Sequence, residues 1–112
     1  MVEPVLSRRL VLEEVIGTSD GAGGIVRTWS TMGVLWAQVR AGSGREKAAD
    51  FVTLSSMSYR ITVRAAPPGA PSRPKPEQRF RDGARIFRIL AVGEAGSDGR
   101  YLTCFAQEEL AA

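Results

Sequence analysis

The 112-residue sequence contains no histidine and only one cysteine, Cys104. Without histidine, the usual Cys/His zinc sites and the histidine-based catalytic triads are excluded, and one cysteine cannot form an intrachain disulfide. Cys104 falls in a predicted strand with no histidine to activate it, so we expect a small core residue there and not a nucleophile. The sequence therefore predicts no catalytic residues, no metal and no cofactor.

A long hydrophobic run is also absent. No apolar stretch approaches the roughly 20 residues that span a bilayer, and the N-terminal segment is interrupted by Glu3, Ser7, Arg8 and Arg9. We therefore expect no membrane partner, no signal peptide and synthesis in the cytoplasm. The length predicts a single domain over residues 1–112.

Carboxylates occur in two adjacent pairs, Glu13–Glu14 and Glu108–Glu109. Neighbouring residues in a strand point to opposite faces, so the two members of such a pair cannot converge on one substrate. We interpret these glutamates as solvated surface residues. The sequence thus indicates a protein that is not an enzyme.

Glycine is concentrated in the stretch TSDGAGGIVRTW, from Thr18 to Trp29. A phosphate-cradling loop must lead into a helix whose N-terminus faces the anion, and a Walker loop ends in GK[ST]. Here the loop leads into the β-branched and aromatic segment IVRTW. We therefore expect a flexible turn between two strands that contains Asp20 and whose glycines are free to adopt positive φ, namely Gly21, Gly23 and Gly24.

Branched and alternating stretches predict about six strands, at residues 9–16, 25–41, 59–65, 78–81, 85–92 and 100–107. Gly33 suggests a bulge that lets the second strand curve, and Asp82-Gly83 marks a tight hairpin. Trp29 and Trp36 are expected in the core because of their size.

One helix is expected between the second and third strands. Ser43 and Glu46 form a capping box, followed by apolar residues at helical spacing, which predicts an amphipathic helix at about residues 44–56. The predicted fold class is therefore mainly β, a small antiparallel β-barrel or sandwich of about six strands with one α-helix packed against it.

Basic residues are concentrated in the middle of the chain, although the net charge is only +3. Residues 60–88 contain eight basic residues against Glu77 and Asp82, and 13 of all 15 basic residues are arginine. Arginine suits phosphates and carboxylates alike, so this region fits a DNA- or partner-facing surface. An ordinary solvated sheet face and a bias in genomic base composition explain the same pattern about equally well.

The candidate DNA- or partner-facing residues fall into two groups. Four lie in predicted strands and would form one outer stripe if those strands are neighbours: Arg60, Arg64, Arg79 and Arg81. Two more, Arg73 and Lys75, lie in a proline-rich loop at residues 66–78 that is expected to be a loop or an extended arm. The interleaved aromatic pattern of a base-stacking module is missing, so any DNA contact is expected to be nonspecific.

The order of these features resembles the head-tail joining family of tailed phages, which comprises small head-closure, adaptor or stopper proteins. The resemblance covers about Arg8 to Glu108. Its most specific parts are Trp36-Ala37 followed by SGRE at 43–46, RITVR at 60–64, and the Asp82-Gly83 hairpin before IFRI at 86–89.

The resemblance implies a structural virion protein without catalytic activity, in a homo-oligomeric ring at the neck of the particle and assembled in the bacterial cytoplasm. Portal or adaptor proteins would lie above the ring, and the tail terminator or other tail proteins below it. Packaged double-stranded DNA would occupy the channel through nonspecific contacts. A gene transfer agent particle fits the Arg- and Ala-rich composition as well as a true phage does. The sequence does not decide whether the ring has six or twelve copies. It also does not decide between an adaptor and a stopper position. The alternative is a stand-alone nonspecific nucleic-acid-binding β-barrel.

The connection between the strands at Tyr59 and Arg79 is longer and richer in proline than is usual in that family. Since proline-rich segments tend to be semi-rigid spacers, we expect Ala66–Lys75 to be a contact or gating arm, with Arg73 and Lys75 facing DNA or an acidic neighbour. The expected assembly loops are the glycine loop and this arm, represented by Asp20, Gly21, Gly23, Gly24, Pro68, Pro71 and Pro74.

Overall fold

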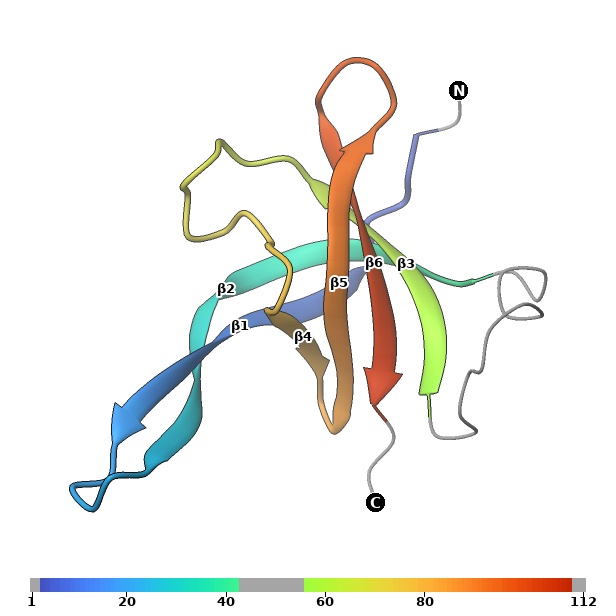
Figure 1. The fold of residues 1–112 in the computed structure, drawn as a ribbon. Helices are drawn as coiled ribbons and strands as arrows, with labels where there is room; N and C mark the ends of the chain where they lie inside the picture. The colour runs from blue at the N-terminus through green and yellow to red at the C-terminus, as the bar shows by residue number, and fades with distance from the viewer. Residues whose placement is uncertain (1–2, 43–55, 110–112) are drawn as a thin grey trace.

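Six antiparallel strands form one sheet that closes on itself in the computed structural model, which describes residues 3–42 and 56–109 (Figure 1). The strands are β1 (Arg8–Ser19), β2 (Ile25–Ala41), β3 (Ser56–Arg64), β4 (Arg79–Asp82), β5 (Arg85–Ala95) and β6 (Tyr101–Glu109). Their order around the barrel is β1-β2-β3-β6-β5-β4, and the pairing of β4 with β1 closes it. The barrel form of the predicted fold class is thus confirmed.

The core fills the inside of this barrel. Alternate residues point inward along each strand, and twelve hydrophobic side chains are buried there: Leu10, Leu12, Leu35, Ala37, Ile61, Val63, Phe80, Phe87, Ile89, Leu102, Cys104 and Ala106. Cys104 is therefore a core residue, as its sequence context predicts. Burial also raises the pKa of its thiol to about 12.

The strand boundaries largely match those predicted. β2 has the predicted limits, and β4 and β5 form a tight hairpin in which Asp82 pairs with Arg85 and Gly83 adopts a positive φ of 61°. The predicted helix at about 44–56 lies outside the described residues, except that Ser56 already begins β3. No helix occurs in residues 3–42 and 56–109.

Gly33 lies at a β-bulge, as predicted. Leu12 pairs with Gly33 but Glu13 pairs with Thr31, so Met32 is the extra residue on β2. A bulge changes the phase of the inward and outward alternation and bends the strand. As a result β1 and β2 leave the barrel beyond this point as a two-stranded ribbon, which extends to the lower left in Figure 1.

Both tryptophans lie outside the barrel, so the prediction that they belong to the core is wrong. Trp36 stands between the buried residues Leu35 and Ala37 on β2, points outward and is 56% exposed. Trp29 lies beyond the bulge on the ribbon and is 38% exposed, with the Arg79 guanidinium 3.9 Å from its ring centre. The inner positions of β2 go instead to the smaller residues Leu35 and Ala37, which fit a six-stranded interior.

Candidate functional site

The four strand arginines predicted to form one stripe lie on two separate parts of the barrel. Arg60 and Arg64 belong to β3, whereas Arg79 and Arg81 belong to β4. Two strands separate β3 from β4 in either direction around the barrel. The prediction of one continuous outer basic stripe is therefore wrong, because it depended on a strand adjacency that the topology does not have.

On the β4 side, both arginines form ion pairs with Glu13. The Arg79 Nε donates to Glu13 Oε1 at 2.7 Å and the Arg81 Nε donates to Oε2 at 3.0 Å. Burial raises the pKa of Glu13, but the hydrogen bonds from the two arginines outweigh it and hold the pKa below its ordinary value. The interpretation of Glu13 as a solvated surface residue is wrong, because the arginines of β4 cover it and leave its side chain only 7% exposed.

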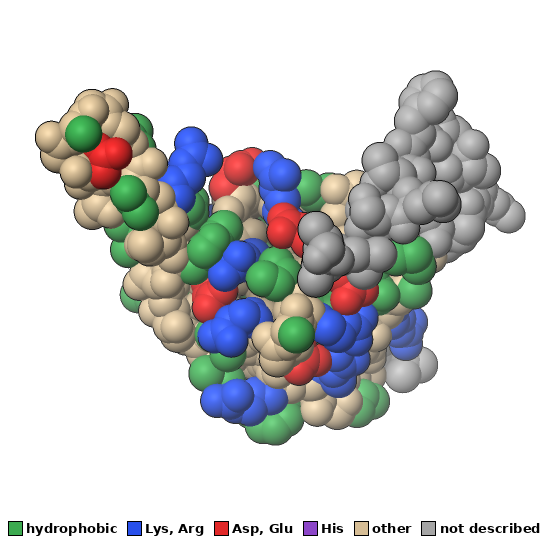
Figure 2. Space-filling view, turned by 90° about the horizontal axis from the view of Figure 1, so that it is seen from below, with side chains coloured by type: hydrophobic (Ala, Val, Ile, Leu, Met, Phe, Trp, Pro, Cys, Tyr) green, Lys and Arg blue, Asp and Glu red, His purple; other side chains and the backbone are tan. Residues whose placement is uncertain are grey.

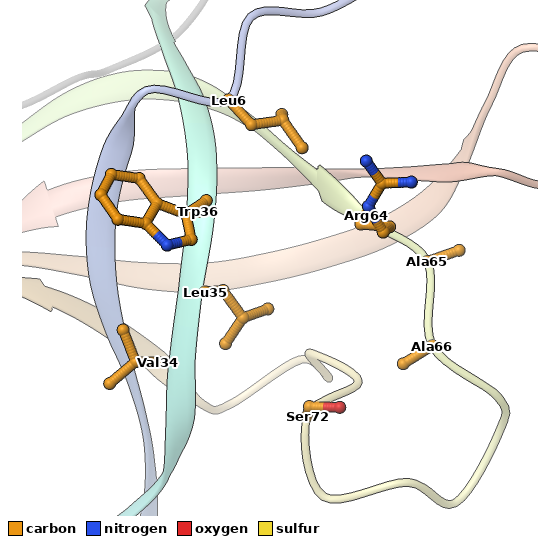
Figure 3. A pocket seen from close by; sticks show the side chains of 8 residues that line it. All are labelled: Leu6, Val34, Leu35, Trp36, Arg64, Ala65, Ala66 and Ser72. Carbon is orange, nitrogen blue, oxygen red and sulfur yellow. The ribbon is translucent and has the colours of Figure 1, made fainter.

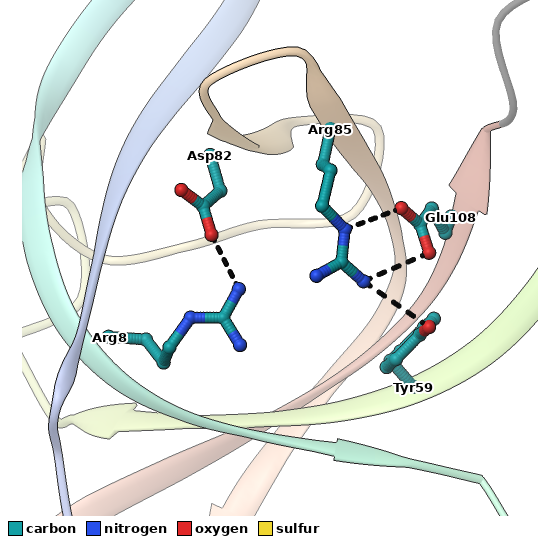
Figure 4. Close-up of polar contacts among 5 residues, drawn as sticks. All are labelled: Arg8, Tyr59, Asp82, Arg85 and Glu108. Atoms are coloured by element: carbon teal, nitrogen blue, oxygen red, sulfur yellow. Dashed lines mark hydrogen bonds and ion pairs between the residues drawn. The ribbon is translucent and has the colours of Figure 1, made fainter.

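Glu108 is also buried, contrary to the sequence interpretation. It points into the barrel at the lower end in Figure 1, where the Arg85 guanidinium donates to its two oxygens at 2.7 and 3.1 Å (Figure 4). Arg85 also donates to the Tyr59 hydroxyl at 3.3 Å, and Arg8 pairs with Asp82 beside it. Hydrogen bonding from Arg85 holds the pKa of Glu108 below its ordinary value. This network fills one end of the barrel with paired charges.

Charges of both signs are mixed on that end of the molecule. Figure 2 shows Lys and Arg side chains alternating with Asp and Glu across the body of the protein when it is viewed from below. Paired charges hold each other in place and leave little net field for an external anion. This end is therefore suited to stability more than to binding DNA.

The outer face of β2, β3 and β6 has a different composition. Because positions directly opposite on paired strands share a face, this face carries Arg40, Arg60 and Arg64 beside Phe105 and Tyr101. The Arg60 guanidinium lies 5.8 Å from the Phe105 ring centre and that of Arg64 lies 5.8 Å from Tyr101. Among the described residues, no carboxylate forms an ion pair with Arg40 or Arg64.

We name this surface the β3 face and define it by its outward-facing basic and aromatic side chains, which are exposed except for the half-buried Tyr101: Arg9, Trp36, Arg40, Arg60, Arg64, Tyr101 and Phe105. Arginine supplies charge for a phosphate backbone, and aromatic rings supply flat apolar surface for sugars, bases or a protein partner. This combination could not be predicted from the sequence. The aromatic residues of β6 lie beside the arginines of β3 because the two strands pair, and the paired residues are about 40 positions apart in the chain.

The proline-rich segment folds into three successive turns and does not form an extended arm. Backbone hydrogen bonds run from Ala70 N to Pro67 O, from Arg73 N to Ala70 O and from Gln78 N to Lys75 O. The second residue of each turn is a proline, namely Pro68, Pro71 and Pro76, which is where the fixed φ of proline favours a turn. Pro74 is fully buried.

The two basic residues of this loop both contact other groups of the same chain. The Arg73 guanidinium donates to the Ala66 carbonyl at 2.7 Å, and the Lys75 ammonium lies 3.6 Å from a Glu14 oxygen. Lys75 is nonetheless mostly exposed. The loop therefore presents a shaped surface next to β2 and not a free basic arm.

The glycine loop is a compact turn between β1 and β2, in agreement with its sequence context. The Asp20 carboxylate accepts hydrogen bonds from the Ala22 and Gly24 amides at 2.8 and 3.0 Å, and these lower the pKa of Asp20. Gly21 and Gly23 have positive φ, as expected, but Gly24 does not. A Cβ at Gly24 would lie 2.5 Å from an Asp20 oxygen, so any larger residue there would displace the Asp20 carboxylate.

Neither a metal site nor a membrane span emerges from the part of the chain that the structure describes. Residues 3–42 and 56–109 hold no cluster of Cys, Asp and Glu able to bind a metal ion. They also contain no helix of the length and apolarity that crossing a bilayer requires.

Comparison with known proteins assigns this barrel to a family. The family model described as "Phage head completion protein" matches residues 1–109. The chain belongs to the phage head completion protein family. It is also similar to a chain of the solved "Virion of native gene transfer agent (GTA) particle", with 59% sequence identity over 98% of this chain and 100% of that chain and a TM-score of 0.81.

A second solved structure shares the fold of this head completion protein. The solution structure of a protein from Shigella flexneri 2a has a TM-score of 0.66 and 21% identity, covering 92% of each chain. None of the curated proteins matches the chain. The resemblance to phage head-tail joining proteins and to a gene transfer agent is confirmed by the family and by the particle.

Proposed function

We propose that this protein is a structural virion component that closes the filled head of a phage-like particle. It acts as a head-closure, or stopper, ring that joins the portal and adaptor to the tail at the particle neck, after assembly in the bacterial cytoplasm. The observation that carries the proposal is the near-complete alignment, at 59% identity, with a chain of a native gene transfer agent virion.

The β3 face is the part of the barrel best suited to meet packaged double-stranded DNA. Arg60 and Arg64 stand on its outer surface together with Arg40. Among the described residues, no carboxylate forms an ion pair with Arg40 or Arg64, whereas Glu13 pairs with both Arg79 and Arg81. Exposed arginines attract phosphates through nonspecific electrostatic contacts. We assign the DNA contacts of the ring to the β3 face, with Arg40 and Arg64 as the main contacts and Arg60 beside them, and not to the β4 arginines.

The glycine loop and the proline-rich loop are proposed to contact neighbouring proteins. Asp20 fixes the shape of the first loop, and the turns at Pro68 and Pro71 together with the buried Pro74 fix the shape of the second. Loops with a fixed shape lose little conformational entropy on binding, which favours recurring contacts in an assembly.

Deleting the gene and examining the resulting particles tests the proposal. We expect heads that lack tails and lose their DNA, seen by electron microscopy and by nuclease sensitivity of the packaged DNA. Complementation with the wild-type gene should restore tailed particles. Normal tailed particles in the deletion strain would refute the head-closure role.

Reversing the charge of one arginine on the β3 face tests whether this face contacts the packaged DNA. Arg64→Glu is expected to increase leakage of DNA from assembled particles several-fold, because a carboxylate would then repel the phosphates. The matched control is Arg88→Glu, at another exposed arginine that lies beside Glu77 on β5, which β6 separates from β3. Equal leakage from both variants would contradict the assignment of the β3 face.

A second candidate function is a stand-alone nonspecific nucleic-acid-binding barrel, which the clustering of arginines and aromatics on the β3 face favours. It predicts that the purified protein binds free DNA with strong salt dependence, and that Arg64→Ala reduces the slope of log K against log salt by about 1. Absence of binding by the purified protein would reject this function.

A further inference from the structure

Beyond the bulge, β1 and β2 form an arm that pairs only with itself. We define the arm as residues Glu14–Ser30, since β1 pairs with β4 only at Val11–Glu13 and β2 pairs with β3 only from Ala37 onward. At about 3.3 Å per residue, its six-residue strands extend about 20 Å from the barrel. Figures 1 and 2 both show the arm standing clear of the body.

The arm exposes apolar side chains that the chain itself does not cover. Val26 is 49% exposed and Ile16 is 42% exposed. Ile16 pairs with Thr28 and Thr18 pairs with Val26, so Ile16 and Val26 share one face of the ribbon, and Ile25 is 71% exposed on the opposite face. A two-stranded ribbon in water is marginally stable alone, and exposed apolar groups on such a ribbon mark a contact surface. The only charged residue between Gly17 and Val26 is Asp20, so the tip is apolar and negatively charged.

A cleft with the complementary character lies between β2 and the proline-rich loop. Its volume is about 460 Å³, and the apolar side chains of Leu6, Val34, Trp36, Ala65 and Ala66 line it (Figure 3). Arg64 supplies a positive charge in this lining, and Arg9 stands next to Trp36 on the neighbouring strand. The cleft therefore combines apolar surface with positive charge, whereas the arm combines apolar surface with negative charge.

The arm of one chain cannot reach its own cleft. Val26 on the arm and Val34 in the cleft lie on the same strand, eight residues apart, which corresponds to about 26 Å along an extended chain. The complementary surface must therefore come from another molecule.

We propose that the arm of each copy docks into the cleft of a second copy of the same chain, with Ile16 and Val26, which share one face of the ribbon, against the apolar lining and Asp20 toward Arg9. This inference rests on the proposed function, because the proposed ring requires a contact between copies. The two surfaces lie on different parts of the molecule, so the contact is head-to-tail, and head-to-tail contacts generate a ring when the rotation closes.

Engineered cysteines at the two surfaces test this docking. Val26→Cys combined with Val34→Cys places one thiol on the arm and one in the cleft. The natural Cys104 does not interfere, because it is fully buried. The intrachain separation of about 26 Å far exceeds the roughly 7 Å limit between the Cα atoms of a disulfide, so every cross-link must join two chains.

Isolated particles that carry this double variant are oxidised and analysed on a non-reducing gel with antibody detection. We expect a ladder of cross-linked multimers that ends at the copy number of the ring, and its loss on reduction. The matched control is Val26→Cys with Leu90→Cys, since Leu90 is as exposed as Val26 but lies on β5. A ladder in this control as strong as in the test variant would overturn the docking, and so would the absence of a ladder in the test variant.

The same samples distinguish failure of the docking from failure of the proposed function. If the variant is present in tailed particles but forms no ladder, the docking is wrong and the head-closure role is unaffected. If the wild-type protein is absent from purified particles, the proposed function is wrong whatever the cross-linking shows. As a second measurement, Ile16→Asp should reduce the incorporation of the protein into particles by at least tenfold, whereas Leu90→Asp, at a residue of similar exposure, should leave incorporation unchanged.

Discussion

Replacing Glu13 with glutamine removes the negative charge that joins β1 to β4 and leaves the shape of the side chain intact. Arg79 and Arg81 donate to the two oxygens of Glu13 at 2.7 and 3.0 Å. A hydrogen bond to a charged group contributes about 1.5–3 kcal/mol, compared with about 0.5–1.5 kcal/mol for a neutral one. Because Arg81 is 42% exposed, its bond is screened by water and counts for less.

The expected loss in the free energy of unfolding for Glu13→Gln is therefore about 2 kcal/mol at pH 7. For a domain of this size, this corresponds to a decrease in Tm of about 8 °C, measurable by circular dichroism. The matched control is Glu14→Gln, whose neighbour Lys75 lies 3.6 Å away in a largely exposed pair. Glu14→Gln should lower the free energy of unfolding by less than about 1 kcal/mol.

The pH dependence gives an independent check. The folded-state pKa of Glu13 lies below its ordinary value, so the stability contributed by its charge is present above the ordinary pKa and is lost as pH falls through the lowered one. The difference in Tm between wild type and Glu13→Gln should therefore be full at neutral pH and shrink below about pH 4. A Tm within about 2 °C of wild type at pH 7, or a difference that does not shrink in acid, would refute the assigned ion pair.

Three further outcomes follow from the fold. Native Cys104 should not react with Ellman's reagent at pH 8, because burial raises the pKa of its thiol to about 12, and the thiol should react fully once the protein is unfolded in guanidinium; rapid labelling of the native protein would contradict this. Gly69→Ala should lower the free energy of unfolding by about 1 kcal/mol, as Gly69 has a φ of 87°. A denaturation midpoint equal to that of wild type would contradict the positive φ at residue 69. Gly24→Ala should displace the Asp20 carboxylate, since the added Cβ would lie 2.5 Å from it. The pKa of Asp20 should then rise toward its ordinary value, and an unchanged NMR titration would reject the proposed close contact.

The sequence predicts the local elements of this protein well. The limits of β2, the bulge at Gly33 and the hairpin after Asp82 are all confirmed, because each depends on residues that are near in sequence. Glycine in a strand interior and an Asp-Gly pair between apolar runs have local meanings that tertiary structure seldom overrides.

What the sequence does not predict depends on pairing between distant strands. The strand order separates Arg60 from Arg79 and brings Arg60 to Phe105 instead. Glu13 was expected to be solvated because no residue near it in the sequence covers it, whereas its burial depends on arginines 66 and 68 positions away. A bulge that changes the phase of a strand, as at Met32 on β2, also makes alternation unreliable across it.

The short pairing between β1 and β4 bears on the proposed docking of the arm. This pairing spans only Val11–Glu13 and Arg79–Arg81, and it lies directly at the bulge where the arm begins. If a neighbour holds the tip of the arm as proposed, a force on the tip acts on a lever about 20 Å long whose pivot is the shortest strand pairing of the barrel wall. We therefore expect such a force to reach β4 and the proline-rich loop that leads into it, which would couple one subunit contact to the shape of the next.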